Sequence, residues 1–318
     1  GESQSILGEP RCMSSAMIYR LLLLCLCLSF PSALLAATRF TLLSPENSQD
    51  MRMRYYREVM QLALEKTRPE YGDYELLDSL PMNKARMRIE VQEQGENALF
   101  IVDSWPYQGE VVAGQGSADQ VASIPFPIDM GILGYRVCFV GSARAAELAR
   151  VNTLDQLRHF TQGAGTGWQD AVILRHGGLT VHEVDNYESL FRMVARGRID
   201  LFCRGANEIL PEWQSHQGKV AGLTVDRHLA LFYPLIHVFY SNAHYVQERE
   251  RLARGLQLAW QDGSLKRLWR HHFQSSLVFA NLGARQIFRL GNPLLLKAGF
   301  DYRPYLYNPQ ADDFGSLP

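Results

Sequence analysis

Short apolar runs alternate along this chain with stretches whose apolar residues recur every three or four positions. A run of about four to eight apolar residues is typical of a buried strand, and three-and-four spacing places one apolar stripe on a helix. The alternation therefore predicts an α/β fold in which helices are layered on sheets. The predicted strands are 39–44, 74–77, 98–102, 135–140, 179–184 and 199–203. The predicted helices are 56–64, 187–196, 245–261 and 265–273.

Four other stretches have less regular patterns. Residues 82–92 alternate like a strand, yet Met82, Ala85 and Ile89 share a helical face. We predict a helix there, because it completes a strand–helix–strand unit. A capping box is predicted at 153–156 and a flexible glycine-rich loop at 163–168. The tail after Gly291 is rich in Pro and Tyr, and we expect it to lie on the surface.

The N-terminal segment differs in composition from the rest. Residues 1–16 show no structural pattern, and we treat them as upstream of the fold. Residues 17–37 combine Arg20, an apolar run at 21–30, Pro31 and a small-residue ending, which is typical of a secretory signal peptide. That run is shorter than the roughly 20 residues that span a bilayer. The segment predicts export to the periplasm, and a retained N-terminal anchor is the alternative.

Composition narrows the class of protein. A chain of 318 residues suits two domains, and 47% hydrophobic with 20% charged residues is typical of a globular protein. A net charge of -1 gives no field that would recruit nucleic acid, so no nucleic-acid partner is expected. Only Cys138 and Cys203 follow the leader. An oxidising compartment permits a disulfide between them, but we favour two free thiols in apolar strands.

Several stretches occur in the order known from one family of binding proteins. They are 124–131, 134–140, 151–157, 163–170, 187–191, 197–202 and 259–268. Together they resemble the periplasmic solute-binding proteins of the amino-acid-receptor type, the family 3 substrate-binding domains with type II topology. Within that family the chain is similar to an orphan-like subgroup. The resemblance covers residues 39–273.

The resemblance implies two α/β lobes joined by two hinge strands, with a ligand in the cleft between the lobes. The hinge strands would be 135–139 and 235–239. The implied division is lobe 1 at 38–134, lobe 2 at 135–234, the second part of lobe 1 at 235–290 and a tail at 291–318.

The glycine-rich loop is the first candidate for ligand contact. Gly165, Thr166 and Gly167 allow a close approach of backbone to ligand, and N–H groups at the following helix start favour an anion. In the resembled family the matching loop contacts the ligand. Trp168 either stacks on the ligand or closes the loop. The alternative is a tight turn that serves packing alone.

Charged residues near strand ends are the second set of candidates. Arg204 follows a predicted strand and suits a bidentate carboxylate or phosphate, but an ion pair with Glu208 is an equal reading. Arg136 has the same two readings, with stabilisation of the hinge favoured. Asn207 and Glu208 start a helix and serve as caps or as ligand contacts. Trp105 lies near a strand end and either lines the cleft or packs in the core.

Two positions depart from the resembled family. The arginine that binds an α-carboxylate there falls on Gln120, and the acid that binds an α-amino group falls on Gly205. An α-amino acid needs both charges. The departures therefore predict a different ligand, a small polar or anionic molecule.

The expected function is binding of a small molecule for an ABC permease or a membrane-bound sensor, by a monomer with no cofactor and no metal. The chain has no Cys-x-x-Cys, His-Glu-x-x-His or Gly-x-Ser-x-Gly motif, and no nucleophile–base pair stands out, so we do not expect an enzyme. Two alternatives remain. One is an enzyme on the same two-lobe scaffold. The other is a ligand-free assembly partner with a degenerate cleft.

Overall fold

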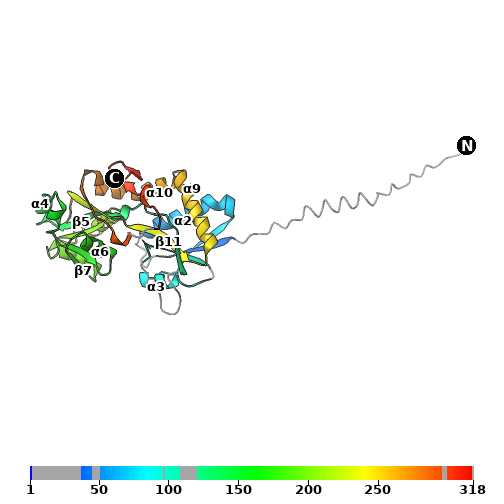
Figure 1. The fold of residues 1–318 in the computed structure, drawn as a ribbon, viewed down its shortest axis with the longest axis horizontal. Helices are drawn as coiled ribbons and strands as arrows, with labels where there is room; N and C mark the ends of the chain where they lie inside the picture. The colour runs from blue at the N-terminus through cyan, green and yellow to red at the C-terminus, as the bar shows by residue number, and fades with distance from the viewer. Residues whose placement is uncertain (2–36, 45–50, 96, 108–119, 296–298, 317–318) are drawn as a thin grey trace. The chain divides into compact units, whose positions relative to one another are not determined.

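A five-stranded sheet is formed by the two flanks of the chain, in the order β2-β1-β3-β11-β4. Its strand β11 is labelled in Figure 1. The computed structural model describes residues 1, 37–44, 51–95, 97–107, 120–295 and 299–316, so the expected leader lies outside the described residues except at its last position. Residues 38–318 form one unit, and the fold belongs to that unit. The strands of this first sheet are β1 (Thr38–Leu42), β2 (Tyr74–Asp78), β3 (Ala98–Trp105), β4 (Val121–Ser123) and β11 (Ile236–Asn242).

Parallel and antiparallel pairs meet in the first sheet. β1 runs parallel to β2 and β3, whereas β11 runs antiparallel to β3 and β4. Helix α2 (Met51–Tyr71) packs on α9 (Val246–Gln261), and a Cβ at Gly255 would overlap the backbone of Ala63 at that contact. The predicted helix in 82–92 is confirmed as α3 (Lys84–Glu90), where the Asn83 side chain accepts the N–H of Arg86.

The middle of the chain forms a seven-stranded sheet in the order β12-β10-β5-β8-β6-β7, with β9 beside β5. Its strands are β5 (Tyr135–Gly141), β6 (Gln162–Gly165), β7 (Val181–Val184), β8 (Leu201–Gly205), β9 (Leu223–Val225), β10 (Leu229–Phe232) and β12 (Gln286–Arg289). Its helices are α4 (Ala145–Leu148), α5 (Leu154–Leu157), α6 (Gln169–His176), α7 (Tyr187–Ala195) and α8 (Ile209–His216). The capping box is confirmed at the start of α5, between Thr153 and Gln156.

Three stretches of the chain connect the sheets, namely two short segments that lie side by side and the longer stretch between β11 and β12. Residues 124–134 lead from β4 to β5, and residues 233–235 lead from β10 to β11. They touch where the Tyr233 N–H donates to the Gly134 carbonyl oxygen at 3.2 Å, and a Cβ at Gly134 would overlap the Tyr233 carbonyl. The predicted α/β fold of two lobes with two crossing strands is confirmed. The two crossing segments lead directly into the two expected hinge strands.

The glycine-rich stretch 163–168 is not entirely a loop, and this prediction was wrong in part. Its first residues form β6, which lies between β7 and β8. A Cβ at Gly163 would overlap Ile199, so this glycine leaves room for a neighbouring core side chain. Small residues here serve close packing as well as chain flexibility.

The C-terminal part of the chain returns to both sheets. Helix α10 (Ser264–Ala280) contacts α2, α9 and α8, and β12 then pairs with β10 in the second sheet, although it falls in the range expected to complete lobe 1. The short strands β13 (Tyr307–Asn308) and β14 (Asp313–Phe314) follow.

The expectation of a surface tail was wrong for Leu306 and Tyr307, which are buried. The Tyr307 N–H donates to the Met130 carbonyl at 2.9 Å, and the Tyr135 hydroxyl donates to the Tyr307 carbonyl at 2.7 Å. Contacts of these tail residues with the first crossing segment and with α10 account for this burial. The Tyr307 and Trp269 rings lie 4.9 Å apart.

A disulfide joins Cys138 and Cys203, so the favoured pair of free thiols was wrong. The two residues face each other directly in the antiparallel register of β5 and β8. The two cysteines are 65 residues apart in the sequence, so local sequence patterns do not show that they are neighbours in the sheet.

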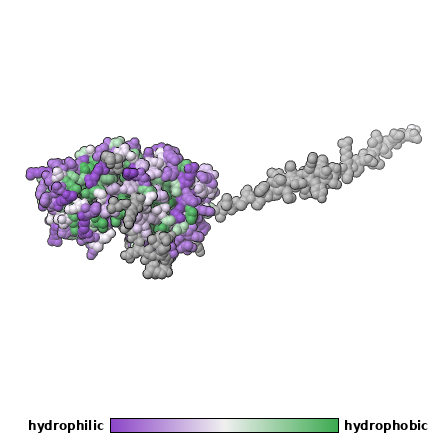
Figure 2. Space-filling view, viewed as in Figure 1, coloured by the Kyte–Doolittle hydropathy of each residue, from purple (hydrophilic) through white to green (hydrophobic). Residues whose placement is uncertain are grey.

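Large exposed apolar side chains are scattered in the described part of the chain, as at Leu80, Val246 and Val278. On the face shown in Figure 2, hydrophobic residues appear as patches between hydrophilic ones. No helix within the described residues has both the length and the apolar character needed to cross a membrane.

Candidate ligand site at the strand ends of the second sheet

All the predicted ligand residues except Trp105 lie in, or directly after, strands of the second sheet. Gly165 ends β6, and the turn of Thr166 and Gly167 leads to Trp168, the N-cap of α6. Arg136 lies in β5 and Arg204 in β8, while Asn207 and Glu208 occupy the turn before α8. β5, β8 and β6 are neighbours in the sheet, which is why residues so far apart in sequence come together.

The Trp168 ring fills the space beside Gly165. A Cβ at Gly165 would overlap the indole, so only glycine permits this ring position. The ring lies 6.3 Å from Phe202 and 6.4 Å from Tyr187. Trp168 therefore belongs to an aromatic cluster that is built around the end of β8.

The turn after β6 is already bonded to acidic side chains. The Thr166 hydroxyl donates to Asp185 at 2.6 Å, and the Gly167 N–H donates to Glu183 at 3.0 Å. The Gly167 N–H, and then the Arg175 guanidinium, hold the pKa of Glu183 below its ordinary value. Donors expected to bind an anion are thus used within the chain.

Arg204 is enclosed by aromatic rings and carboxylates. Its guanidinium carbon lies 4.8 Å from the Trp168 ring centre and 5.6 Å from that of Tyr187. Its Nε donates to both Glu212 oxygens at 2.9 Å, and a terminal nitrogen lies 3.1 Å from Glu208. Burial alone would lower the pKa of Arg204, but Glu208 and Glu212 raise it above the ordinary value. The ion pair with Glu208, one of the two readings from sequence, is therefore present.

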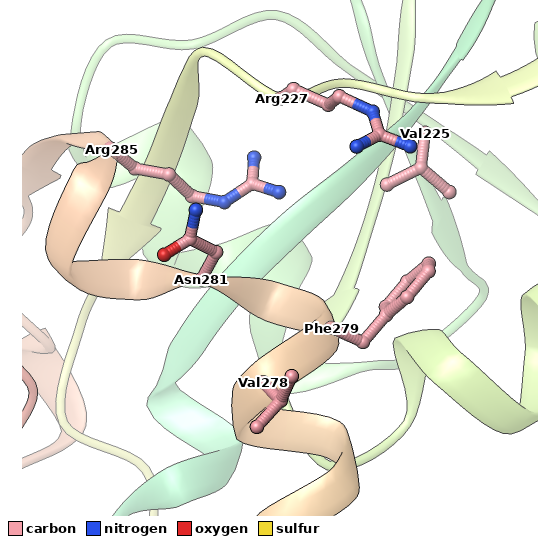
Figure 3. Close-up of a pocket in the computed structure, with 6 residues that line it drawn as sticks. All are labelled: Val225, Arg227, Val278, Phe279, Asn281 and Arg285. Carbon is pink, nitrogen blue, oxygen red and sulfur yellow. The ribbon is translucent and has the colours of Figure 1, made fainter.

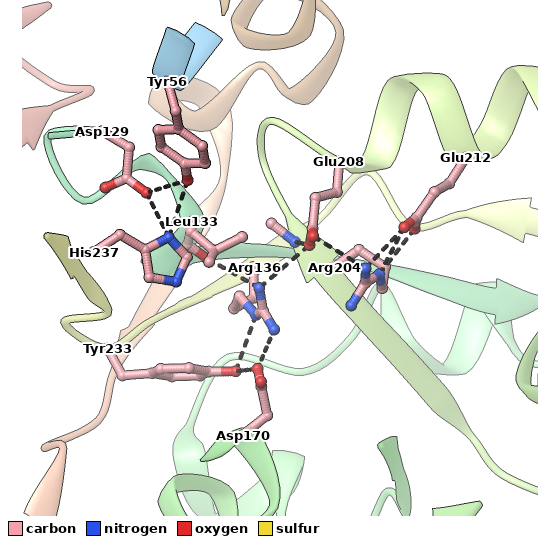
Figure 4. Close-up of polar contacts among 11 residues, drawn as sticks. Tyr56, Asp129, Leu133, Arg136, Asp170, Arg204, Glu208, Glu212, Tyr233 and His237 are labelled. Atoms are coloured by element: carbon pink, nitrogen blue, oxygen red, sulfur yellow. Dashed lines mark hydrogen bonds and ion pairs between the residues drawn. The ribbon is translucent and has the colours of Figure 1, made fainter. Parts of the chain in front are cut away.

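Arg136 links both crossing segments (Figure 4). It donates to the Leu133 carbonyl at 3.0 Å and to the Tyr233 hydroxyl at 3.0 Å, and it also pairs with Asp170. Glu208 lies 3.6 Å away, between the two arginines. Burial would lower the pKa of Arg136, and the neighbouring Asp170 raises it instead.

The space beside Gly205 is filled by two acceptors. The Glu208 carboxylate accepts the Gly205 N–H at 3.0 Å, and the Asn207 Oδ1 lies 2.6 Å from where a Cβ would be at that glycine. Asn207 is only 9% exposed, and its Oδ1 has no hydrogen-bond partner among the described residues. Glu208 thus places a carboxylate next to the position where the resembled family has an acid.

The charges of this cluster do not favour an anion. Two guanidinium groups, those of Arg136 and Arg204, face the three carboxylates of Asp170, Glu208 and Glu212. An incoming anion would compete with carboxylates that are already in place. The three carboxylates, which are hydrogen-bond acceptors, outnumber the two guanidinium groups.

A second polar cluster fixes the first crossing segment to the first sheet. The His237 Nδ1 and the Tyr56 hydroxyl lie 3.0 Å and 3.3 Å from an Asp129 oxygen (Figure 4). Asp129 belongs to the crossing segment, Tyr56 to α2 and His237 to β11. This cluster anchors the segment.

Trp105 and Gln120 belong to the first sheet and its surroundings. The Trp105 ring is partly exposed and packs on Phe300 at 4.7 Å between ring centres. Gln120, which takes the place of an arginine in the resembled family, keeps a buried Oε1 without a hydrogen-bond partner among the described residues.

Sequence reasoning missed three participants in the second-sheet cluster, namely Asp170, Tyr187 and Glu212. One signal was available for Glu212. Arg204, Glu208 and Glu212 are spaced by four residues, which suits ion pairs along one helical face. Asp170 and Tyr187 reach the cluster only through tertiary folding.

Two hollows are present elsewhere on the described chain. One, of about 240 Å³, is lined by Val225, Arg227, Val278, Phe279, Asn281 and Arg285 (Figure 3). The other, of about 210 Å³, is lined by Ser189, Arg192, Met193, Arg196 and Arg198. Neither includes a predicted ligand residue. No group of three or more His, Cys, Asp or Glu side chains suited to a metal ion occurs in the described ranges.

No family model and no curated protein matches the sequence. Solved structures do match about three quarters of the chain. The YckB protein of Bacillus subtilis is 15% identical over 79% of this chain and 95% of its own, with a TM-score of 0.49. An arginine-specific periplasmic binding protein of Salmonella typhimurium is 11% identical over 75% and 100%, with a TM-score of 0.48.

The VFT2 domain of Bordetella pertussis BvgS is 14% identical over 74% of this chain and 92% of its own, with a TM-score of 0.47. The fold assignment itself rests on the strand order of the two sheets and on their two crossing segments.

Proposed function

We propose that this chain is a non-enzymatic solute-binding protein that takes a small polar molecule bearing N–H or O–H donors. The observation that carries the proposal is the buried Asn207 Oδ1, which has no hydrogen-bond partner among the described residues. An unpaired buried acceptor costs free energy, roughly 1–3 kcal/mol, that a ligand donor would recover. The neighbouring Glu208 carboxylate adds a second acceptor.

Between a polar and an anionic ligand, the cluster supports the polar one. Both guanidiniums are paired with carboxylates, and the donors of Thr166 and Gly167 are bonded to acids. A neutral donor-bearing solute, such as a polyol or an amide, meets no like charge there. The predicted signal peptide supports a periplasmic setting, in which an ABC permease or a membrane-bound sensor would recognise the loaded protein.

A ligand screen tests this proposal. We expect neutral polyols and amides to raise the melting temperature, with dicarboxylates and ordinary amino acids having no effect. A ligand at about 100 times its Kd adds about 2.7 kcal/mol to the free energy of unfolding. Asn207→Leu is the matched variant, because it replaces an unpaired acceptor by an apolar group of similar size without loss of a hydrogen bond.

The Asn207→Leu protein should be as stable as the wild type and should lose the ligand response. Stabilisation by anions alone, or an equal response of both proteins, would contradict the proposal. Turnover of the ligand, followed by NMR, would favour the enzyme alternative.

A second candidate is a ligand-free assembly partner. The observation in its favour is that the cluster is closed by internal ion pairs, with neither hollow reaching it. Native mass spectrometry of protein purified from cells distinguishes the two. A stable complex with a membrane protein and no small molecule would support this candidate.

A further inference from the structure

The surroundings of Arg204 have the composition of a cation-binding site. We call the side chains of Trp168, Tyr187, Glu208 and Glu212 the cation box. The indole lies 4.8 Å and the phenol 5.6 Å from the guanidinium carbon, within the range of cation–π attraction. Both Glu212 oxygens accept from the guanidinium Nε at 2.9 Å, and Glu208 contacts another of its nitrogens. Rings and carboxylates of this kind recognise planar cations.

The walls of the cation box are held independently of Arg204. Trp168 caps α6, Tyr187 starts α7, and Glu212 lies in the first turn of α8. The Trp168 ring is fitted against Gly165, and the Glu208 carboxylate accepts the Gly205 N–H. The backbone positions that carry the box therefore do not depend on the Arg204 side chain.

The carboxylates of the box need a cation. The Glu208 and Glu212 side chains are only 6% and 14% exposed. Two carboxylates this close and this poorly solvated repel each other unless a positive charge lies between them. Arg136 reaches Glu208 at 3.6 Å but is itself paired with Asp170, so Arg204 supplies the charge that Glu212 requires.

We infer that the cation box is a guanidinium-binding site filled from within by Arg204, which acts as a specificity-determining residue. The tethered side chain competes at a high effective concentration with any free cation. The wild-type protein therefore excludes guanidinium-bearing solutes, and removal of the Arg204 side chain creates a site for them. The inference goes beyond the proposed function, because it does not depend on the native ligand.

The test is chemical rescue of Arg204→Ala with methylguanidinium, measured by thermal unfolding and calorimetry, with equal KCl as the salt control. Methylguanidinium should raise the melting temperature of Arg204→Ala and bind it at least about tenfold more tightly than it binds the wild type. If Arg204→Ala does not fold alone, its refolding yield with and without methylguanidinium gives the same comparison.

Two further variants serve as controls. Arg285→Ala removes another buried arginine, which donates mainly to backbone carbonyls and has one carboxylate, that of Asp226, at 3.7 Å, so methylguanidinium should rescue it less than it rescues Arg204→Ala. Arg204→Ala combined with Glu212→Gln should lose the rescue, because one carboxylate of the box is gone. Equal stabilisation of the wild type, of Arg285→Ala or of the double variant, or no effect on Arg204→Ala, would overturn the inference. None of these outcomes bears on the Asn207→Leu screen, so the two proposals fail separately.

Discussion

Two ionic clusters of this protein differ in how many of their charges are buried. In the second sheet both signs are buried: the Arg136 and Arg204 side chains are only 2% and 9% exposed, and the Glu208 and Glu212 side chains 6% and 14%. In the first sheet only the anion is fully buried: Asp103 is 1% exposed and pairs with Arg88 at 2.9 Å and with the largely exposed Lys84 at 3.1 Å. Water can solvate the partners left behind in the first sheet but not those left in the second. Loss of one ion-pair partner should therefore lower the free energy of unfolding more in the second-sheet cluster than in the first-sheet cluster.

The largest effect is expected from Arg136→Met, which keeps side-chain length but leaves Asp170 and Glu208 without this cation. Loss of one partner of a buried ion pair costs about 3–5 kcal/mol. Urea unfolding at pH 7 measures the change. A loss below about 1 kcal/mol would show that the two clusters are energetically alike.

A smaller loss is expected when the disulfide beside Arg204 is removed by Cys138→Ala and Cys203→Ala together. The bond closes a long loop between β5 and β8, and its removal typically lowers the free energy of unfolding by about 2–4 kcal/mol. Reducing agent should destabilise the wild type and leave the double variant unchanged. Wild type and variant of equal stability without reductant would contradict this.

A still smaller effect is expected in the first sheet, for Asp103→Asn. Burial raises the pKa of Asp103, but Lys84 and Arg88 outweigh it and lower the pKa below the ordinary value of 3.8. Its contribution to stability is therefore present above pH 3.8 and is lost as the pH falls below it. At pH 7 the variant should be about 1–2 kcal/mol less stable, and the difference should shrink in acid.

Lys84→Met is the control for this cluster, because the Lys84 side chain is 62% exposed. It should cost less than about 1 kcal/mol. A loss from Lys84→Met as large as that from Arg136→Met would remove the distinction between the clusters.

Local patterns in the sequence were enough for many elements. The three-and-four spacing at 187–196 corresponds to α7, and the capping box at 153–156 begins α5. Each of these signals lies within one or two turns of the chain. The crossing at 233–235 falls within residues 229–241, where a long run rich in aromatic residues favours an extended segment.

Features that depend on distant neighbours were not readable. The Cys138–Cys203 bond follows from strand register, and the burial of Tyr307 follows from contact with Met130 and Trp269. In the candidate site, the sequence indicated Arg136 and Arg204, but not that acidic side chains of α6 and α8 neutralise both arginines. Charge balance is a property of the assembled site.

The buried tail has a mechanical consequence for the two sheets. The crossing segments that touch at Gly134 and Tyr233 are not the only link between the sheets. Helix α10 contacts helices of both sheets. Tyr307 forms hydrogen bonds with Met130 and Tyr135, which lie on either side of Gly134. A rotation of one sheet against the other about the crossing segments would strain the contacts that span those segments. Any swing of one sheet against the other must therefore carry the chain end along or detach it.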